Sequence, residues 1–401
     1  MTIRQPSKDR LGLGSLIALA VGTFTLGTDA MVLNGLLPTI ATDLRVSESG
    51  AGQLTTVFAL TYAVSSPLIA AFTGSWDRRI LLAGGLGLFT VGMMGQAVGT
   101  TFAVVALARA LAAIGAAAFQ ANAFALAGAL SSDERRGRAL ATVAAGMSVS
   151  TVVGVPIGVF AGQWIGWRAV MWVIAAIGLA LAAYLPFLPA VRIPAANLRT
   201  RLAVVIRPPV ARVLLVTVTG LLAGITVFVY LPVLVAPVAA GATLSWVLAA
   251  YGVGQLLGTT VAGRWTDRFG SARVRTWSLV GTAVALASMN LAVLALPALF
   301  VVVLLSGFSG GMLMVPQQHR LYSLAPDAAT VALGLNGSAS YVGVALGSAL
   351  GGTVLAGAGA GWLGPVGAVV AVAALALATA RRRATPAIAP TPERLMSRTR
   401  R

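Results

Sequence analysis

The sequence predicts an all-α membrane protein with twelve transmembrane helices, built as two six-helix bundles with both chain ends in the cytoplasm. Two observations carry this prediction. Only 9% of the 401 residues are charged and 58% are hydrophobic, a composition that cannot cover the surface of a water-soluble domain of this length. The apolar residues also fall into twelve runs, each close to the roughly 20 residues that cross about 30 Å of hydrocarbon as a helix.

The twelve predicted spans are separated by Pro, Gly or polar breaks. The first six are residues 13–37, 52–73, 80–98, 101–130, 139–162 and 169–188. The second six are residues 213–237, 244–263, 276–295, 298–324, 331–356 and 362–380. We therefore predict an N-terminal bundle at 1–190, a cytoplasmic linker rich in Arg and Pro at 191–212, a C-terminal bundle at 213–380 and a basic cytoplasmic tail at 381–401.

The basic residues set the orientation. If the N-terminus is cytoplasmic, 24 of the 28 Lys and Arg residues lie in the tails, loops and linker on the cytoplasmic side. This asymmetry is what the positive-inside rule requires. Three basic residues precede the first apolar run, which is too long for a signal peptide and lacks a convincing cleavage site. We interpret it as an uncleaved first helix.

Composition also excludes several kinds of chemistry. The net charge of +18 comes from basic residues that lie between the apolar runs and do not cluster on one domain, so we expect no nucleic-acid partner. There is no cysteine and one histidine, so we expect no metal site and no cofactor. The only lysine, Lys8, follows no phosphate-binding glycine loop. ATP hydrolysis is thus excluded, and the energy for any transport must come from a gradient.

An internal repeat connects the two halves. Gly74-Ser-Trp-Asp77-Arg78-Arg79 follows the second span, and Gly263-Arg-Trp-Thr-Asp267-Arg268 follows the eighth, 189 residues later. Asp133 and Asp327 form a second echo at a spacing of 194 residues. These echoes predict a duplicated six-helix unit, and parallel repeats of this kind are typical of transporters that work by alternating access.

The fifth span carries the motif with the clearest family resemblance. Its small residues and proline are Gly146, Gly154, Pro156, Gly158 and Gly162. This run resembles the antiporter motif of the major facilitator superfamily, in the form seen in arabinose-efflux and chloramphenicol-resistance permeases. Small residues let helices approach closely, and the proline permits a bend. The resemblance implies a helix that seals the interface between the halves; simple packing is the alternative.

The loop between the eighth and ninth spans resembles the cytoplasmic signature of the same family. The matching residues are Gly263, Asp267, Arg268, Gly270 and Arg273. The equivalent loop in the first half is eroded: Asp77 stands one residue closer to Gly74 and no glycine follows, although Arg78 and Arg79 are retained. The resemblance implies that these loops act as cytoplasmic gates. The alternative is that they cap helices and set the topology.

Asp29 is the only carboxylate inside a predicted span. A charged residue at the middle of a membrane helix costs roughly 2.5 to 3.5 kcal/mol on insertion scales, so it indicates function by default. Arg109, in the fourth span, resembles the intramembrane arginine of the family, and both residues lie about 12 to 14 Å from the outer interface at 1.5 Å per residue. We expect them to pair, or to compete for a proton, as the proton-coupling residues; a purely structural tie between helices is the alternative.

Other polar residues in the spans are candidates for the wall of a substrate cavity, although they could equally serve as interhelical hydrogen bonds. They are Asn34, Gln120, Asn122, Gln255, Asn336 and Tyr341.

The resemblance implies proton-coupled efflux of a small organic molecule, a drug or a sugar-like compound, by a protein of the bacterial inner membrane. We expect the substrate, protons and the bilayer as partners, and a monomer. An uptake symporter of the same fold is the first alternative. A membrane-embedded enzyme or sensor is the second, and it is disfavoured because the spans offer only Asp29, Arg109 and His319 as ionisable groups.

Overall fold

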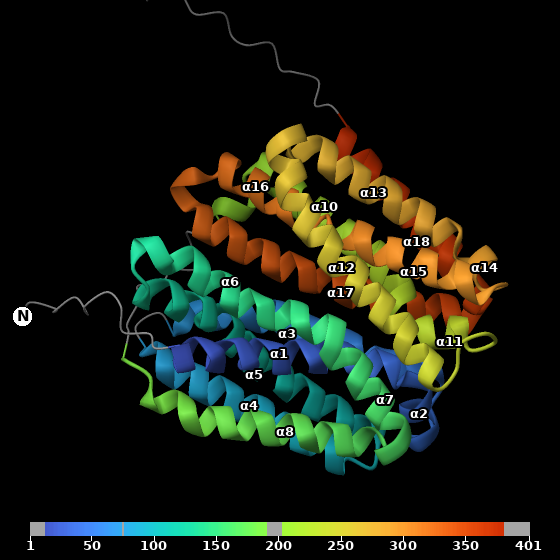
Figure 1. Ribbon diagram of the computed structural model, residues 1–401, viewed down its shortest axis with the longest axis horizontal. Coiled ribbons are helices and arrows are strands. Elements are labelled where there is room, and N and C mark those ends of the chain that lie inside the picture. The colour runs from blue at the N-terminus through green and yellow to red at the C-terminus, as the bar shows by residue number, and fades with distance from the viewer. Residues whose placement is uncertain (1–12, 74–75, 191–202, 381–401) are drawn as a thin grey trace, which may run out of the picture.

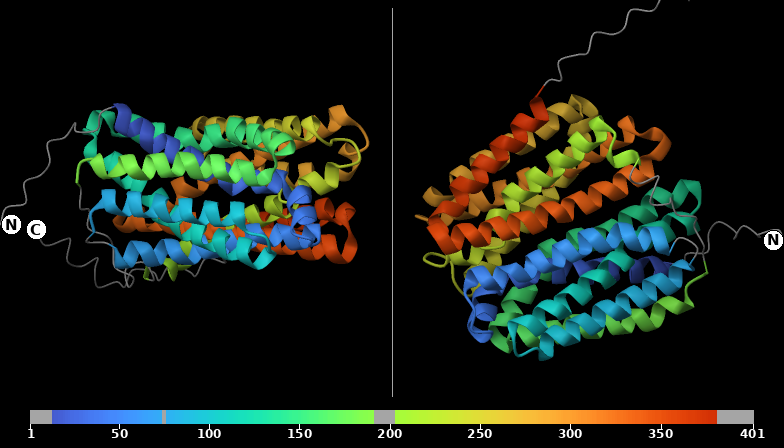
Figure 2. Two further views of the ribbon diagram at one scale, coloured as in Figure 1. Left: turned by 90° about the horizontal axis from the view of Figure 1, so that it is seen from below. Right: turned by 180° about the vertical axis from the view of Figure 1, so that it is seen from behind.

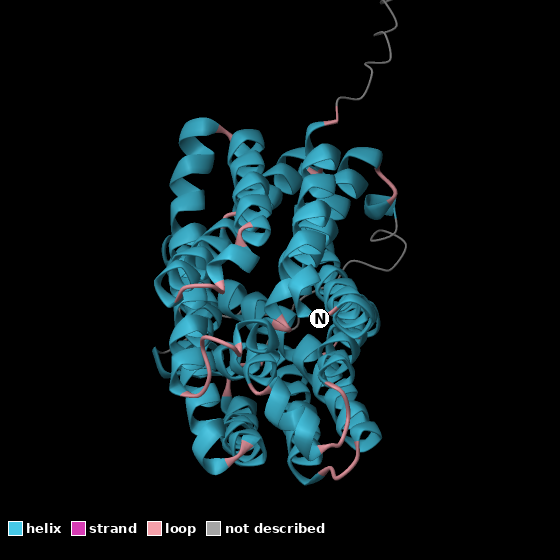
Figure 3. Cartoon of the chain, turned by 90° about the vertical axis from the view of Figure 1, so that its right-hand side faces the viewer, coloured by secondary structure: helices cyan, strands magenta, loops and turns pink. Residues whose placement is uncertain are grey.

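The structure is a computed structural model that describes residues 13–73, 76–190 and 203–380. All regular elements in these ranges are helices (Figure 3). The predicted all-α membrane fold is therefore confirmed. Gly74, most of the predicted linker and the whole basic tail lie outside the described residues.

The N-terminal half contains six membrane-crossing segments. They are α1 (Leu13–Gly35), α3 (Glu48–Phe72), α4 (Arg78–Val98), α5 (Phe102–Leu130), the segment α6 (Asp133–Val149) with η1 (Ser150–Gly154) and α7 (Val155–Ile165), and α8 (Trp167–Tyr184) with η2 (Leu185–Phe187). The short α2 (Leu37–Asp43) follows α1, and Pro38 in its first turn pre-sets the helical backbone angle.

The C-terminal half repeats this plan. Its segments are α10 (Pro208–Phe228) with α11 (Leu231–Val235), α12 (Ala242–Phe269), α13 (Ser271–Ala287) with α14 (Met289–Ala292), α15 (Leu296–Gly311) with α16 (Met314–Leu324), α17 (Ala329–Ala358) after η3 (Pro326–Ala328), and α18 (Leu363–Thr379) after η4 (Ala360–Trp362). Eleven helices in the described ranges are long and apolar enough to cross a membrane.

The ninth predicted span, residues 276–295, is a broken helix. Ser288, with φ −83° and ψ −3°, separates α13 from α14. The Ser288 hydroxyl donates to the carbonyl oxygens of Val284 (2.9 Å) and Ala285 (3.1 Å). Side-chain bonds of this kind compete with the helical ladder. The apolar pattern predicted the segment, but the serine shortens its regular part.

The long helices run side by side between two ends of the molecule (Figures 1 and 2). We call the end where α1 begins and α18 stops the tail face, and the opposite end the far face. Figure 1 shows the N-terminal half, in blue to green, beside the C-terminal half, in yellow to red. The two most extensive contacts between the halves are α3 against α17, and η1 with α7 against α12.

At the tail face, an exposed ion pair links Arg207, directly before α10, to Asp327 of η3, directly before α17. Arg207 donates to both carboxylate oxygens of Asp327, at 3.0 and 2.8 Å. The Arg207 guanidinium holds the pKa of Asp327 below its usual value, chiefly through these hydrogen bonds. Exposed pairs contribute little to stability, so this contact fixes geometry more than it adds free energy.

Candidate functional site

A fully buried ion pair lies between α1 and α5. One guanidinium nitrogen of Arg109 donates to Asp29 Oδ1 at 2.5 Å, and the other donates to the backbone oxygen of Asp29 at 3.3 Å. Both side chains are 0% exposed. The contact expected from their matching depth is therefore present, while their role in proton coupling stays a prediction.

The pair is not saturated with hydrogen bonds. Asp29 Oδ2 and Arg109 Nε are buried and have no hydrogen-bond partner among the described residues. Asp29 is also the only fully buried acidic side chain among those whose exposure the structure describes. A buried carboxylate with one free oxygen is a place where a proton can bind without displacing another contact.

Three aromatic rings connect this pair to the other half of the protein. The Arg109 guanidinium lies over the Phe58 ring at 4.3 Å from its centroid. Phe58 stacks on Tyr62, also in α3, at 6.3 Å, and Tyr62 stacks on Tyr341 of α17 at 3.7 Å. We predicted Tyr341 from the sequence but not Phe58 and Tyr62. Their spacing of four residues on one helix was the available signal.

Polar contacts between the two halves lie at the far face. Among the described residues, four hydrogen bonds join the halves. Two of them run between α3 and α17. Ser49 Oγ donates to the Gly352 oxygen at 2.7 Å, and Ser348 Oγ donates to the Gly52 oxygen at 2.9 Å. Added side-chain atoms at Gly52 and Gly352 would collide with neighbours, so glycine permits this close crossing.

The other two bonds extend this far-face contact. Gln53 Nε2 donates to the Tyr230 hydroxyl at 3.4 Å, and that hydroxyl donates to the Ser348 oxygen at 3.0 Å. Gln163 Nε2, at the end of α7, donates to the Gly241 oxygen at 2.8 Å. At the tail face, α6 packs against α1 and α5 of its own half. The halves are thus fastened at the far face.

The small residues of the predicted antiporter motif face α1. A Cβ atom at Gly158 would meet Val32 at 2.7 Å, and one at Gly162 would meet Leu36 at 2.6 Å. A Cβ atom at Gly154 would collide with Thr28, one residue before Asp29. The stripe therefore packs within the N-terminal half.

The helix changes type at this motif. Residues 150–154 form a π-helical turn, in which the Val155 N–H bonds to the Ser150 oxygen, directly before Pro156. This turn also brings the backbone at Thr151 and Val152 against Gly252 of α12. The contact with the other half is thus made by Thr151 and Val152, next to the motif glycines, and not by the glycines themselves. Turns of this type occur frequently at functional sites.

Comparison with known proteins settles the family. The family model of the Major Facilitator Superfamily matches residues 19–239 and 217–399. The chain belongs to the major facilitator superfamily. It is a multi-pass membrane transporter and not an enzyme.

Several relatives of this superfamily member cover most of the chain. It is 39% identical to a chloramphenicol resistance protein of Streptomyces lividans over 265 residues, 63% of this chain and 67% of the relative. It is 31% identical to the inner membrane transport protein YdhP of Escherichia coli K12, over 92% of this chain and 96% of the relative.

Solved structures show the same fold at low identity. A bacterial homologue of the lysosomal transporter Spinster, in an inward-facing and occupied conformation, superposes with a TM-score of 0.75 at 17% identity, over 90% of this chain and 95% of that one. The nucleoside transporter NupG superposes with a TM-score of 0.74 at 12% identity, over 90% and 98%.

In this superfamily member the two loops predicted as gates differ in structure. In the first half, Asp77 caps α4 by accepting from the Arg79 backbone N–H at 3.1 Å and from Arg79 Nε at 3.0 Å. Arg78 turns inward and donates to Asn122 Oδ1 at 2.8 Å. The eroded loop thus ties the start of α4 to α5.

In the second half, the predicted loop residues Gly263, Asp267 and Arg268 lie within α12, which continues to Phe269. Gly270 joins α12 to α13 at φ +84°, a backbone conformation that favours glycine. The side chains of Asp267, Arg268 and Arg273 are exposed, and the Arg268 guanidinium lies 5.2 Å from the centroid of the Phe269 ring. No side-chain atom or backbone atom lies within 4 Å of a Cβ built at Gly263.

The polar residues predicted to line a cavity divide into two groups. The three asparagines are buried and engaged: Asn34 accepts from Thr55 at 2.8 Å, Asn336 accepts from Thr217 at 2.8 Å, and Asn122 accepts from Arg78. The side chains that are only partly buried are Gln120, Gln255 and Tyr341. The second group is the better placed to meet a substrate.

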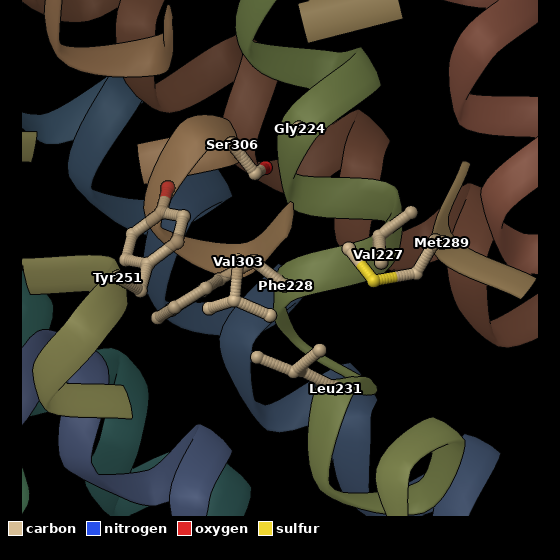
Figure 4. A pocket seen from close by; sticks show the side chains of 8 residues that line it. All are labelled: Gly224, Val227, Phe228, Leu231, Tyr251, Met289, Val303 and Ser306. Atoms are coloured by element: carbon tan, nitrogen blue, oxygen red, sulfur yellow. The ribbon is translucent and has the colours of Figure 1, made fainter. Parts of the chain in front are cut away.

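Two of the cavities in the described part of the chain are lined by other residues than these. One of about 310 Å³ opens at the tail face between the start of α1, the end of α5 and the start of α6, with Arg138 in its wall. The other, of about 10 Å³, lies inside the C-terminal half beside Tyr251, Met289 and Ser306 (Figure 4). It is large enough for one water molecule at most, so it is not a substrate site.

Proposed function

We propose that this protein exports a small organic molecule across the bacterial inner membrane in exchange for protons, and that it works as a monomer. The observation that most supports this proposal is the buried Asp29–Arg109 pair, in which one carboxylate oxygen has no hydrogen bond. A carboxylate in this position is expensive to bury, and its free oxygen can accept a proton once Arg109 finds another partner.

The pair suggests how coupling works. When Asp29 is ionised, Arg109 is held at 2.5 Å and the two charges compensate each other. When a proton binds at Oδ2, the attraction weakens and Arg109 is released to donate to a substrate or to new partners. Because Phe58 and Tyr62 connect Arg109 to Tyr341, this release reaches the contact between the two halves.

The far-face contact supports an assignment of state. We propose that the tail face is cytoplasmic, as the distribution of basic residues predicts. The four inter-half hydrogen bonds then close the periplasmic side, and the protein is open toward the cytoplasm, where an exporter takes up its substrate.

The test uses everted membrane vesicles that contain the protein and an acidified lumen, with a fluorescent reporter of the pH difference. Chloramphenicol is the first compound to add, because one relative is named for resistance to it; other antibiotics and sugars follow. We expect addition of a substrate to release protons from the lumen. Asp29→Asn should abolish this release. Glu48→Gln, which removes the charge of a carboxylate at the start of α3, should retain it.

Two outcomes would contradict the proposal. Full substrate-dependent proton release by Asp29→Asn would remove Asp29 from the coupling reaction. Accumulation of substrate with protons in the same direction would identify the symporter instead.

A further inference from the structure

Three arginines from three helices meet at the tail face of the C-terminal half. They are Arg212 on α10, Arg275 on α13 and Arg320 on α16, and they lie close enough for their charges to repel one another. We call them the arginine cluster. Arg212 and Arg275 contact the last turn of α18, which ends beside the start of α13 in Figure 1.

Two of the three arginines bind backbone carbonyls of that turn. A guanidinium nitrogen of Arg275 donates to the Ala378 oxygen at 2.9 Å. Arg212 donates to the Leu377 oxygen through two nitrogens at 2.9 and 2.8 Å, and also to the Ala380 oxygen. The end of a helix carries only about half a negative charge. It therefore balances a small part of the three positive charges.

The cluster has no carboxylate partner among the described residues. The ion pairs among the described residues involve other arginines, namely Arg79, Arg109, Arg168 and Arg207. Arg275 is 5% exposed and its Nε has no hydrogen-bond partner. Arg212 and Arg320 are partly exposed, so donors of the cluster can be reached from outside. Buried like charges without a counterion are unfavourable, and an anion would relieve them.

Aromatic residues place the cluster at the level of lipid headgroups. Trp265 and Trp277 contact each other edge to face at 5.6 Å and are 36% and 42% exposed. Trp277 is two residues from Arg275. Exposed tryptophans gather at the membrane–water interface, so the anion nearest to the cluster is a phospholipid phosphate.

We infer that the arginine cluster is a binding site for the phosphate of an anionic phospholipid, held between α10, α13, α16 and the end of α18. Arginine suits this ligand because its planar fork presents several N–H donors to phosphate oxygens. Basic pockets between transmembrane helices are a recurrent way of binding such headgroups. A zwitterionic lipid is a poorer ligand, because its ammonium group meets the same positive charges.

Native mass spectrometry of the purified full-length protein tests this inference with phosphatidylglycerol as the probe. Arg320→Gln is the first variant, because the Arg320 side chain forms no hydrogen bond with a described residue and its loss should disturb the fold least. A basic residue that contacts the bound headgroup contributes about a fivefold gain in affinity for anionic lipid. We therefore expect Arg320→Gln to weaken phosphatidylglycerol binding about fivefold, and Arg320→Lys to retain most of it.

The matched control is Arg264→Gln, an exposed arginine near the end of α12 at the same face. It should bind phosphatidylglycerol as the wild type does, and phosphatidylcholine should bind all variants equally weakly. The inference is wrong if Arg264→Gln weakens binding as much as Arg320→Gln, or if neither variant changes it. Displacement of the lipid by millimolar inorganic phosphate would also overturn it, since free phosphate would then be the ligand.

Discussion

Removing one member of the Asp29–Arg109 pair should destabilise the protein more than removing both. The perturbation is a double-mutant cycle of Asp29→Asn, Arg109→Met and the double variant. Met is chosen because its thioether can keep a contact with the Phe58 ring, over which the Arg109 guanidinium lies at 4.3 Å. Asn keeps the size of the Asp29 side chain and removes its charge.

The magnitude follows from the burial of the pair. Both side chains are 0% exposed, and breaking a buried pair by removing one partner costs about 3 to 5 kcal/mol, whereas replacing both partners is often close to neutral. Asp29→Asn should be the more costly single change, because Arg109 cannot lose its proton. In Arg109→Met the remaining carboxyl can bind a proton instead, so its destabilisation should shrink as the pH falls.

The free energy of unfolding is measured by titrating detergent-solubilised protein with dodecyl sulfate and following tryptophan fluorescence. A coupling energy of about 2 kcal/mol or more between the two positions is expected. If each single change costs less than about 1 kcal/mol and the two costs simply add, the two charges do not compensate each other, and the coupling mechanism built on their pairing loses its basis.

Three further results are expected. Gly154→Leu should cost about 1 to 3 kcal/mol through overpacking against α1, whereas Gly84→Leu, where a Cβ meets nothing within 4 Å, should unfold at the wild-type dodecyl sulfate concentration. The chain has no cysteine, so Gln163→Cys with Ala242→Cys, both exposed beside the Gln163–Gly241 contact between the halves, allows a short bifunctional maleimide to lock the far face; transport should stop on cross-linking and continue in each single variant. Tyr341→Ala should leave substrate binding measurable by calorimetry but reduce the protons released per substrate, and an unchanged ratio would exclude the aromatic link from coupling.

Hydropathy and small-residue patterns were sufficient to predict the fold, because the bilayer demands long apolar runs and leaves little choice of secondary structure. The same argument placed Asp29 and Arg109 at one depth, and contact followed because α1 and α5 are neighbours. Depth alone could not predict Phe58 and Tyr62, since aromatic residues are also common in lipid-facing positions.

The sequence did not predict the hydrogen-bond partners of polar side chains that can reach more than one neighbouring helix. Asn34, Asn122 and Asn336 look alike as intramembrane polar groups, yet each bonds to a partner on another helix that hydropathy does not identify. Asp43 illustrates a contact that no local pattern predicts: it accepts from Trp167 Nε1 at 2.9 Å and pairs with Arg168. These contacts depend on which helices meet, and that is a property of the folded bundle.

The π-helical turn at residues 150–154 also determines how this helix tolerates insertion and deletion. In a regular α-helix, the 16 residues from Gly146 to Gly162 would rotate the second glycine about 160° away from the first at 100° per residue. One residue taken up by the wider turn reduces this angle to about 60°, and both glycines face α1. Deleting a single residue between Ser150 and Gly154 would leave a regular α-helix that still turns both glycines toward α1, whereas inserting one residue would turn Gly158 and Gly162 away, so this segment should tolerate a deletion better than an insertion.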